Sequence, residues 1–438
     1  MYKIRPLNKV KRQIVVPADK SISHRAAIIS SISKGKTHIK PYLVSEDTQA
    51  TLDCLKICGV RVNLNKEGLL TVEGVGLYLS RKKRVTLSAG ESGTTLRILS
   101  GLLCAQKFST RFNSANSLEK RPMGRITVPL KLMGADIKGK CVKSEEYPPL
   151  KINPAKLEGI RYRLPIPSAQ VKSALLLASL YAKGETQIIE PAASRDHTER
   201  MLSLFKAKLK RQGKSIISSR VKMLISPNEL FIPSDFSSAS FFIVLGLILK
   251  NSEILIKNVN INPTRCGLLR VLIRMGAKIE IINKKDYYEP YTDILVKSSS
   301  LRATEVEKKE IPSMIDEIPI LAVAASFAKG KTRLKGVGEL KVKETDRINS
   351  LRYNLTKVGV EICAYKYKKQ GREDWALEIK GNPCFYKKGR VEFRSFSDHR
   401  TAMSLIILAA AGERESKIDE IQCINKSFPE FIPLIESL

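Results

Sequence analysis

A seven-residue run near the N-terminus, Asp19–Arg25 (Asp-Lys-Ser-Ile-Ser-His-Arg), combines two cations with two hydroxyl groups. Lys20 offers an anion a compact positive charge, whereas Arg25 offers a planar set of donors that matches phosphate or carboxylate. The serines, Ser21 among them, add hydroxyl donors. The apolar run 26–29 follows at once, so the segment is expected to open a helix, whose N-terminal end favours negative charge. This pattern indicates an anion site, and a charged helix start on the surface is the alternative.

Two further segments in the N-terminal half have comparable chemistry. In Gly90–Arg97 (Gly-Glu-Ser-Gly-Thr-Thr-Leu-Arg), glycines allow the backbone to approach a ligand and hydroxyl groups can cap a following helix. The segment lacks the Gly-Lys-Ser/Thr ending of a P-loop, and an ordinary turn is the alternative. In Lys120–Arg125, Pro122 restricts Arg121 to an extended conformation and so orients its guanidinium, although surface turns share this pattern.

A fourth segment, Ser168–Ser173, precedes the apolar run 174–180, which is expected to be a buried helix. Ser168 and Gln170 can bind a phosphate or a polyol, and a simple N-cap is the alternative. The run Ser194–His197, after a Glu-Pro turn, has the same character.

The C-terminal half contains acids beside cations. Asp316 and Glu317 lie between apolar residues, where an ionised carboxylate is costly unless it is paired, so a raised pKa and a role as a base are predicted. Acidic and basic residues lie within a few positions of one another in Lys343–Arg347 (Lys-Glu-Thr-Asp-Arg) and in Asp398–Arg400. Lys426 follows near the C-terminus. A solvated charged face is the alternative for each segment.

The elements that must position these residues form a repeat. A helical pattern that ends at a glycine and is followed by a strand pattern recurs at Gly59, Gly134, Gly276 and Gly359, with a weaker copy at 204–217. The spacing of roughly seventy to eighty residues exceeds the ~20–50 residues of solenoid repeats. The pattern therefore predicts one α/β subdomain that is repeated several times.

The net charge of +33 is the most unusual feature of the composition. A basic excess of this size favours nucleic acid or another anionic surface as a partner. The lysines, however, are spread along the chain, without a basic tail or interleaved aromatic residues. The densest cluster, Arg81–Arg84, is interpreted as a solvated turn, and most of the charge as a lysine-rich surface.

Two compositional changes, near Ala18–Lys20 and near Ile232–Asp235, indicate domain crossings. They predict an N-terminal lobe of residues 21–232 and a C-terminal lobe of residues 1–20 plus 233–438. The apolar runs are too short for a membrane helix, no signal peptide is visible, and the eight cysteines lack a metal-binding spacing. Reduced thiols, a cytoplasmic location and no metal are therefore expected.

Taken together, the segments resemble the 5-enolpyruvylshikimate-3-phosphate synthase (3-phosphoshikimate 1-carboxyvinyltransferase) family across essentially the whole chain. The motifs that carry the resemblance are Asp-Lys-Ser-x-Ser-His-Arg, Ser-Gly-Thr-Thr-Leu-Arg, Arg-Pro-Met-Gly, Ser-Ala-Gln-x-Lys-Ser-Ala, Ser-Arg-Asp-His-Thr-Glu, Lys-Glu-Thr-Asp-Arg and Asp-His-Arg-x-Ala-Met. The resemblance implies an α/β fold of two lobes, each built of three βαβαββ-type repeats packed as an inverted (inside-out) barrel. That architecture agrees with the repeat and with the two crossings.

The resemblance also implies an activity: transfer of the enolpyruvyl (carboxyvinyl) group of phosphoenolpyruvate to the 5-hydroxyl of shikimate 3-phosphate, with release of phosphate, in chorismate and aromatic amino acid biosynthesis. The implied contacts to shikimate 3-phosphate are Lys20, Ser21, Arg25, Ser168, Ala169, Gln170, Ser194, Asp316 and Lys343. The implied contacts to phosphoenolpyruvate are Lys20, Gly93, Arg121, Gln170, Arg347, Arg400 and Lys426. A monomer without cofactor, membrane partner or nucleic-acid partner is expected.

For catalysis, the resemblance implies that Asp316 accepts the hydroxyl proton and that Glu344 protonates the methylene carbon of phosphoenolpyruvate, while Lys20 stabilises charge nearby. Gly93, rather than alanine, leaves room near the phosphate of phosphoenolpyruvate, which predicts sensitivity to glyphosate.

Three other interpretations remain open from the sequence. A UDP-N-acetylglucosamine enolpyruvyl transferase would have the same fold, but the segment around Arg121 lacks the loop cysteine that such enzymes use. A polyanion-binding protein would explain the charge and leave Asp316 and Glu344 without a role. An inactive homologue is the third, although every expected cation is present.

Overall fold

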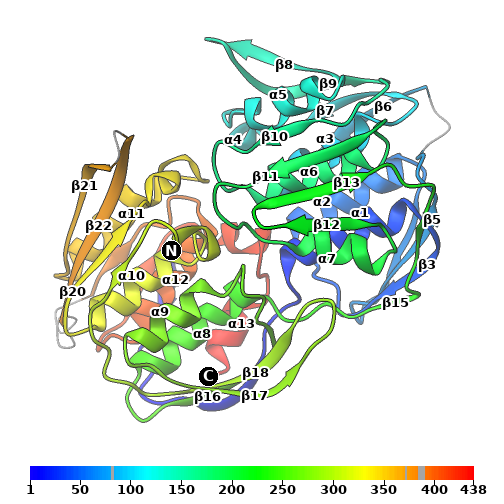
Figure 1. The fold of residues 1–438 in the computed structure, drawn as a ribbon. Coiled ribbons are helices and arrows are strands. Elements are labelled where there is room, and N and C mark those ends of the chain that lie inside the picture. The colour runs from blue at the N-terminus through cyan, green and yellow to red at the C-terminus, as the bar shows by residue number, and fades with distance from the viewer. Residues whose placement is uncertain (80–82, 370–371, 383–389) are drawn as a thin grey trace. The chain divides into compact units, whose positions relative to one another are not determined.

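The computed structural model describes residues 1–79, 83–369, 372–382 and 390–438 of this mixed α/β protein (Figure 1). The chain forms two compact units: a split unit, Met1–Pro17 plus Pro233–Leu438, and a continuous unit, Ala18–Ile232. The first crossing lies three residues before the expected one, because Lys20 is the first residue of helix α1 (Lys20–Ser31) in the continuous unit. Arg81 and Lys82 of the basic cluster lie outside the described residues. Among the described helices, none combines the length and apolar character needed to cross a membrane.

The continuous unit contains three sheets that share one topology. In each sheet, a central strand pairs in parallel with one strand, or with two short strands in the first sheet, and two further strands follow on its other side in antiparallel pairing. The strands are β3 (Ser33–Ile39), β4 (Arg61–Leu64), β5 (Leu70–Val75), β14 (Leu224–Ile225) and β15 (Glu229–Leu230) in the first sheet; β6 (Arg84–Ser88), β7 (Ser109–Asn113), β8 (Asp136–Val142) and β9 (Glu145–Asn153) in the second; and β10 (Arg161–Arg163), β11 (Glu185–Ile189), β12 (Leu209–Gln212) and β13 (Ser215–Ser219) in the third.

The split unit repeats this topology, with a reduced third sheet. Its strands are β2 (Lys11–Val15), β16 (Glu253–Asn260), β17 (Lys278–Lys285) and β18 (Tyr291–Lys297); β19 (Glu305–Val306), β20 (Gly330–Lys335), β21 (Glu361–Lys369) and β22 (Arg372–Gly381); and β1 (Tyr2–Ile4), β23 (Glu392–Phe393) and β24 (Ser416–Ile418). The N-terminal strand β1 pairs with β24, near the other end of the chain.

Among the described residues, each unit contains three largely buried helices and several more polar ones. The buried helices are α1, α3 (Gly93–Leu103) and α6 (Ala169–Ser179) in the continuous unit, and α8 (Phe236–Ile248), α10 (Ile318–Phe327) and α12 (His399–Ala410) in the split unit. Within each unit the buried helices pack against one another and form the core. The other helical elements are α2 (Glu46–Ile57), α4 (Asn116–Glu119), α5 (Gly124–Leu132), α7 (His197–Leu204), α9 (Gly267–Arg274), α11 (Arg347–Lys357), α13 (Phe431–Glu436), η1 (Ile311–Ser313), η2 (Gly338–Val342) and η3 (Ile421–Lys426).

The predicted helix–glycine–strand repeat is confirmed. Gly59, Gly134, Gly276 and Gly359 follow α2, α5, α9 and α11, and each has a φ between 86° and 91°. This left-handed conformation ends the helix and carries a steric cost for residues that have a Cβ atom. In the weaker copy, Lys206 adopts the same conformation after α7, with a φ of 69°.

Candidate active site

In the continuous unit, six of the nine predicted site residues lie at the N-terminal ends of the buried helices. Asp19 caps α1 by accepting from the backbone N–H of Ile22 at 2.9 Å. Ser92 and Ser168 cap α3 and α6 in the same way. The capped helix ends carry the first-turn residues Lys20, Ser21, Gly93, Ala169 and Gln170. Such ends favour negative charge, which suits the anion-binding role predicted for these residues.

Hydroxyl and carbonyl oxygens hold the guanidinium of Arg25, which is only 4% exposed. Its Nε donates to Thr198 Oγ1 at 2.7 Å, and its Nη2 donates to Ser173 Oγ at 2.8 Å. Its Nη1 donates to the carbonyl of Ser21 at 2.8 Å. The contacts join α1, α6 and α7, so the position of Arg25 is fixed by three helices.

Gln170 and Gly93 lie in a second group of polar contacts. Arg97 donates to Gln170 Oε1 at 2.8 Å, and Gln170 Nε2 donates to Thr94 Oγ1 at 3.0 Å. A Cβ atom on Gly93 would lie 3.2 Å from Nη1 of Arg97 and 3.4 Å from Nη1 of Arg121. The structure therefore brings Arg121 beside Gly93 and adds Arg97, for which no separate role was predicted.

Lys20 and His24 connect α1 to its neighbours. Lys20 Nζ lies 2.9 Å from Asp47 Oδ2 of α2. His24 Nδ1 lies 2.7 Å from Thr51 Oγ1, which in turn lies 2.7 Å from Thr95 Oγ1 of α3. Burial lowers the pKa of His24 well below its ordinary value, and the charges of Lys20 and Arg25 lower it further. His24 is therefore a neutral hydrogen-bonding residue at neutral pH.

A buried ion cluster that the sequence did not predict supports Ser194. Glu190 Oε1 accepts hydrogen bonds from the backbone N–H of Ser194 at 3.1 Å and from its hydroxyl. The other oxygen of Glu190 lies 3.2 Å from Nζ of Lys172, which also contacts Glu199 at 2.7 Å. Burial raises the pKa of Glu199, and Lys172 opposes that shift. The sequence feature that could have predicted this cluster is Lys172 within the apolar helix α6, because a fully buried cation requires acidic partners.

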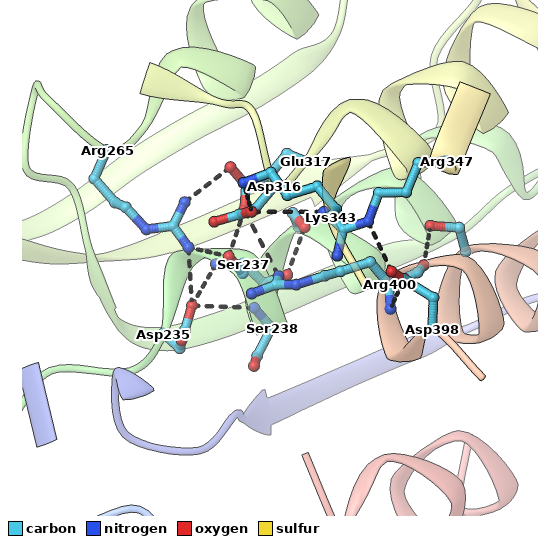
Figure 2. A network of polar contacts seen from close by, with 12 residues as sticks. Asp235, Ser237, Ser238, Arg265, Asp316, Glu317, Lys343, Arg347, Asp398 and Arg400 are labelled. Carbon is cyan, nitrogen blue, oxygen red and sulfur yellow. Dashed lines mark hydrogen bonds and ion pairs between the residues drawn. The ribbon is translucent and has the colours of Figure 1, made fainter. Parts of the chain in front are cut away.

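In the split unit, one guanidinium contacts both predicted catalytic carboxylates. Arg347 Nη2 donates to Glu344 Oε2 at 2.7 Å. Its Nη1 lies 3.6 Å from Asp316 Oδ1 (Figure 2). Lys343 Nζ approaches the same oxygen of Asp316 at 3.4 Å. The side chains of Asp316 and Glu344 are 20% and 28% exposed, so both remain accessible.

Asp398 anchors Arg347 from the buried side. Arg347 Nε donates to Asp398 Oδ2 at 2.9 Å, and Asp398 Oδ1 caps α12 by accepting from the backbone N–H of Arg400 and Thr401. Burial lowers the pKa of Arg347, but the neighbouring carboxylates outweigh it, so the pKa is raised above its ordinary value. Burial raises the pKa of Asp398, while Arg347 favours its charged form.

Arg400 is held by a second buried network. Its Nη1 lies 3.7 Å from Glu317 Oε1, and Arg265 Nη1 lies 2.8 Å from the other oxygen of Glu317 (Figure 2). Ser237 donates to Glu317, and Arg265 also lies 3.4 Å from Asp235, the cap of α8. Glu317 and Arg265 are 0% and 1% exposed. The sequence indicated that an acid at position 317 needs a partner, but it did not identify Arg265.

The remaining predicted residue, Lys426, is the last residue of η3, which packs against α12. The predicted residues thus form two clusters, one in each unit. Among the described residues, no group of three or more His, Cys, Asp or Glu side chains is arranged to hold a metal ion.

Comparison with known proteins gives the same family throughout. The family model described as EPSP synthase (3-phosphoshikimate 1-carboxyvinyltransferase) matches residues 4–435. The 3-phosphoshikimate 1-carboxyvinyltransferase of Petrotoga mobilis is 45% identical over 437 residues, which cover 99% of this chain and 98% of the relative. The protein of the same name from Thermodesulfovibrio yellowstonii is 43% identical, with 99% of each chain covered.

Solved structures extend the comparison. An EPSP synthase from Acinetobacter baumannii superposes with a TM-score of 0.85 at 38% identity, covering 99% of this chain and 97% of that one. The enolpyruvyl transferase NikO from Streptomyces tendae, at 14% identity, has a TM-score of 0.76 over 100% and 96% of the two chains and shares the fold. The motifs, the family model and the relatives agree, and this chain belongs to the EPSP synthase (3-phosphoshikimate 1-carboxyvinyltransferase) family.

Proposed function

We propose that this chain transfers the enolpyruvyl group of phosphoenolpyruvate to the 5-hydroxyl of shikimate 3-phosphate. The observation that carries the proposal is the guanidinium of Arg347, which contacts Glu344 and lies near Asp316. This arrangement supplies an acid, a base and a cation for a substrate that bears a phosphate and a carboxylate. We further propose that the two units are the lobes of an inverted α/β barrel, each lobe containing three repeats.

Shikimate 3-phosphate is assigned mainly to the cluster of the continuous unit. Arg25 is oriented by three oxygen atoms, and its fork can bind a phosphate through parallel hydrogen bonds. The helix N-termini next to it add backbone donors. The residues assigned to this substrate are Lys20, Ser21, Arg25, Ser168, Ala169, Gln170 and Ser194, with Asp316 and Lys343 from the split unit.

Phosphoenolpyruvate is assigned to cations from both clusters. Arg347 and Arg400 are each fixed by a buried carboxylate, which sets their orientation before the substrate binds. Arg121 beside Gly93 supplies a further cation. The residues assigned to phosphoenolpyruvate are Lys20, Gly93, Arg121, Gln170, Arg347, Arg400 and Lys426.

The proposed reaction is an addition followed by an elimination. Asp316 accepts the proton of the 5-hydroxyl as its oxygen bonds to C2 of phosphoenolpyruvate, while Glu344 donates a proton to C3. In the elimination, Glu344 takes a proton back from C3 as the bond between C2 and the phosphate oxygen breaks, and Asp316 gives its proton to the leaving phosphate. The double bond and both carboxyl groups are thereby restored, and phosphate is released. Lys20 stabilises the negative charge near this centre. The two carboxylates then have opposite roles, as general base and general acid.

The same site gives a basis for glyphosate sensitivity. Glyphosate would compete with phosphoenolpyruvate, and Gly93 leaves space that a methyl group would take from Arg97 and Arg121. We expect glyphosate to inhibit the enzyme and the Gly93→Ala variant to resist it, at the cost of a higher KM for phosphoenolpyruvate. An unchanged rate at high glyphosate concentration would refute this expectation.

The decisive experiment measures phosphate release from phosphoenolpyruvate by purified protein, with and without shikimate 3-phosphate. UDP-N-acetylglucosamine serves as the competing acceptor. Release that requires shikimate 3-phosphate is the expected result. Release only with the nucleotide sugar, or with neither acceptor from folded protein, would overturn the proposal. The reaction as written needs no metal or organic cofactor, and we expect a cytoplasmic enzyme that light scattering reports as a monomer.

A further inference from the structure

The sheet β6–β7–β9–β8 of the continuous unit carries a concentrated positive charge that the proposed reaction does not use (Figure 1). A hollow of about 620 Å³ lies against this sheet. Five exposed cations from its four strands line the hollow: Arg84, Arg111, Lys138, Lys140 and Lys151. None of the described residues that line it is acidic or aromatic.

The strand register places these cations beside one another. Arg111 of β7 lies directly opposite Lys151 of β9, and Lys151 lies opposite Lys138 of β8. Like charges directly opposite each other on neighbouring strands destabilise a sheet. None of the five cations forms an ion pair with a residue that the structure describes. The nearby acid on β8, Asp136, accepts a hydrogen bond from Asn153 at 2.7 Å.

Three other sheets of the same protein compensate exposed cations with acids. In each, a lysine on one strand contacts a glutamate on the neighbouring strand. The pairs are Lys36–Glu73 at 3.0 Å, Lys297–Glu280 at 2.9 Å and Lys331–Glu378 at 2.8 Å. Among the described residues, the row of Arg111, Lys151 and Lys138 has no such acid, and a bound anion would reduce the repulsion within it.

We propose that this hollow is a binding site for a compact chain of linked phosphates, such as tripolyphosphate or the phosphate chain of a nucleoside triphosphate. Neighbouring strands lie about 4.8 Å apart, so the row of three cations spans about 10 Å, a length that suits a short chain of charges. The volume falls within the range of about 300–1,000 Å³ typical of small-molecule sites. The absence of aromatic residues from its described lining disfavours single-stranded nucleic acid, which stacks on aromatic side chains.

The test compares two double variants that change the net charge equally. Arg111→Glu/Lys138→Glu reverses the two outer cations of the row and leaves Lys151 between them. Lys210→Glu/Lys222→Glu reverses two exposed lysines elsewhere in the continuous unit and is the matched control. Calorimetric titrations of tripolyphosphate and of ATP are run at fixed salt in the presence of saturating shikimate 3-phosphate, which occupies the anion site around Arg25.

We expect the hollow variant to weaken tripolyphosphate binding by about tenfold or more and the control to change it by less than about twofold. Equal binding of tripolyphosphate and ATP would identify the phosphate chain as the recognised group, whereas tighter binding of ATP would assign the site to a nucleotide. The variant should melt no lower than the wild-type protein without ligand, because it replaces like-charge contacts with opposite-charge contacts. Its basal phosphate release should stay unchanged.

Three outcomes would overturn the proposal. If both double variants weaken tripolyphosphate binding equally, the binding depends on the net charge of the protein and not on the hollow. Binding that survives in the hollow variant but disappears in Arg25→Ala would assign it to the active site. Binding of RNA or of anionic vesicles without measurable binding of tripolyphosphate would assign the surface to a macromolecular partner instead.

Discussion

Arg25 of the continuous unit and the arginines Arg347 and Arg400 of the split unit are held by different chemistry. Arg25 donates to two hydroxyl oxygens and one carbonyl oxygen. Arg347 contacts three carboxylates, and Arg400 contacts the buried Glu317. Hydroxyl and carbonyl oxygens orient a guanidinium through neutral acceptors, whereas carboxylates orient it and also neutralise part of its charge. The first environment suits strong attraction of a dianion, and the second suits exact orientation beside groups that exchange protons.

The comparison predicts large losses of activity or stability when a carboxylate contact is removed, and smaller losses when a hydroxyl contact is removed. The largest is expected for Glu344→Gln, which keeps the shape of the side chain but removes the proton donor. We expect kcat to fall by about 10²–10⁴-fold, with the affinity for both substrates retained. Phosphate release and equilibrium binding measure the two quantities. Glu361→Gln, an exposed change on β21, is the control, and full activity of Glu344→Gln would remove Glu344 from the catalytic role.

The second prediction concerns the support of Arg400. Arg265→Met leaves Glu317 buried with one cation fewer, and we expect a loss of about 3–5 kcal/mol in the free energy of unfolding. Urea denaturation measures it. The double variant Arg265→Met/Glu317→Gln should recover part of the loss, because the unpaired charge is gone, and it should raise the KM for phosphoenolpyruvate more than that for shikimate 3-phosphate. Arg270→Met, at an exposed arginine of α9, should change stability by less than about 0.5 kcal/mol. A double variant less stable than the single one would contradict the pairing.

The third prediction concerns how the free energy of unfolding depends on pH through His24. Its folded-state pKa is lowered, mainly by burial, so the unfolded chain takes up a proton first as the pH falls. The contribution of His24 to the free energy of unfolding should therefore be fully present above pH ~6.5, the ordinary pKa of histidine. Below that pH, the free energy of unfolding should fall by at most about 1.4 kcal/mol per pH unit. His24→Asn should flatten the decline, whereas His38→Asn, at an exposed histidine, should leave it unchanged. Equal pH profiles for wild-type protein and His24→Asn would refute the argument.

The smallest effect is expected for the hydroxyl groups that accept hydrogen bonds from Arg25. Thr198→Val removes the acceptor for Arg25 Nε, and a hydrogen bond to a charged group contributes at most about 1.5–3 kcal/mol. The KM for shikimate 3-phosphate should rise about ten- to hundredfold with kcat unchanged. Thr198→Ser should restore the wild-type value. A fall in kcat at constant KM would instead place Thr198 in the chemical step.

The local part of this structure was predictable from the sequence. The glycines at 59, 134, 276 and 359 signal helix ends because a positive φ favours a residue without Cβ. Likewise, Asp19, Ser92 and Ser168 signal caps through short-range hydrogen bonds. Asp316, Glu344 and Arg347 were predicted to act together on the basis of motifs, and their contacts agree with that grouping.

The long-range partners were not predictable in the same way. Arg265 meets Glu317 across 52 residues of sequence, and Lys172 meets Glu190 across 18, so no local pattern pairs them. The lysine-rich composition was interpreted as an even surface. Its concentration on the β6–β7–β9–β8 sheet depends on strand register, which the sequence does not specify for five well-separated cations.

The pairing of β1 with β24 has a consequence for how the chain is made. Residues 2–15 are translated long before their partners, because Tyr2 pairs with Ile418 and Lys11 pairs with Glu253. The described strands of the continuous unit all lie within residues 18–232, so this unit can complete its sheets during synthesis. Strand β1 has to stay available until Ile418 has been translated. The sheet that contains β1 and β24 therefore joins a strand made early to a strand made late.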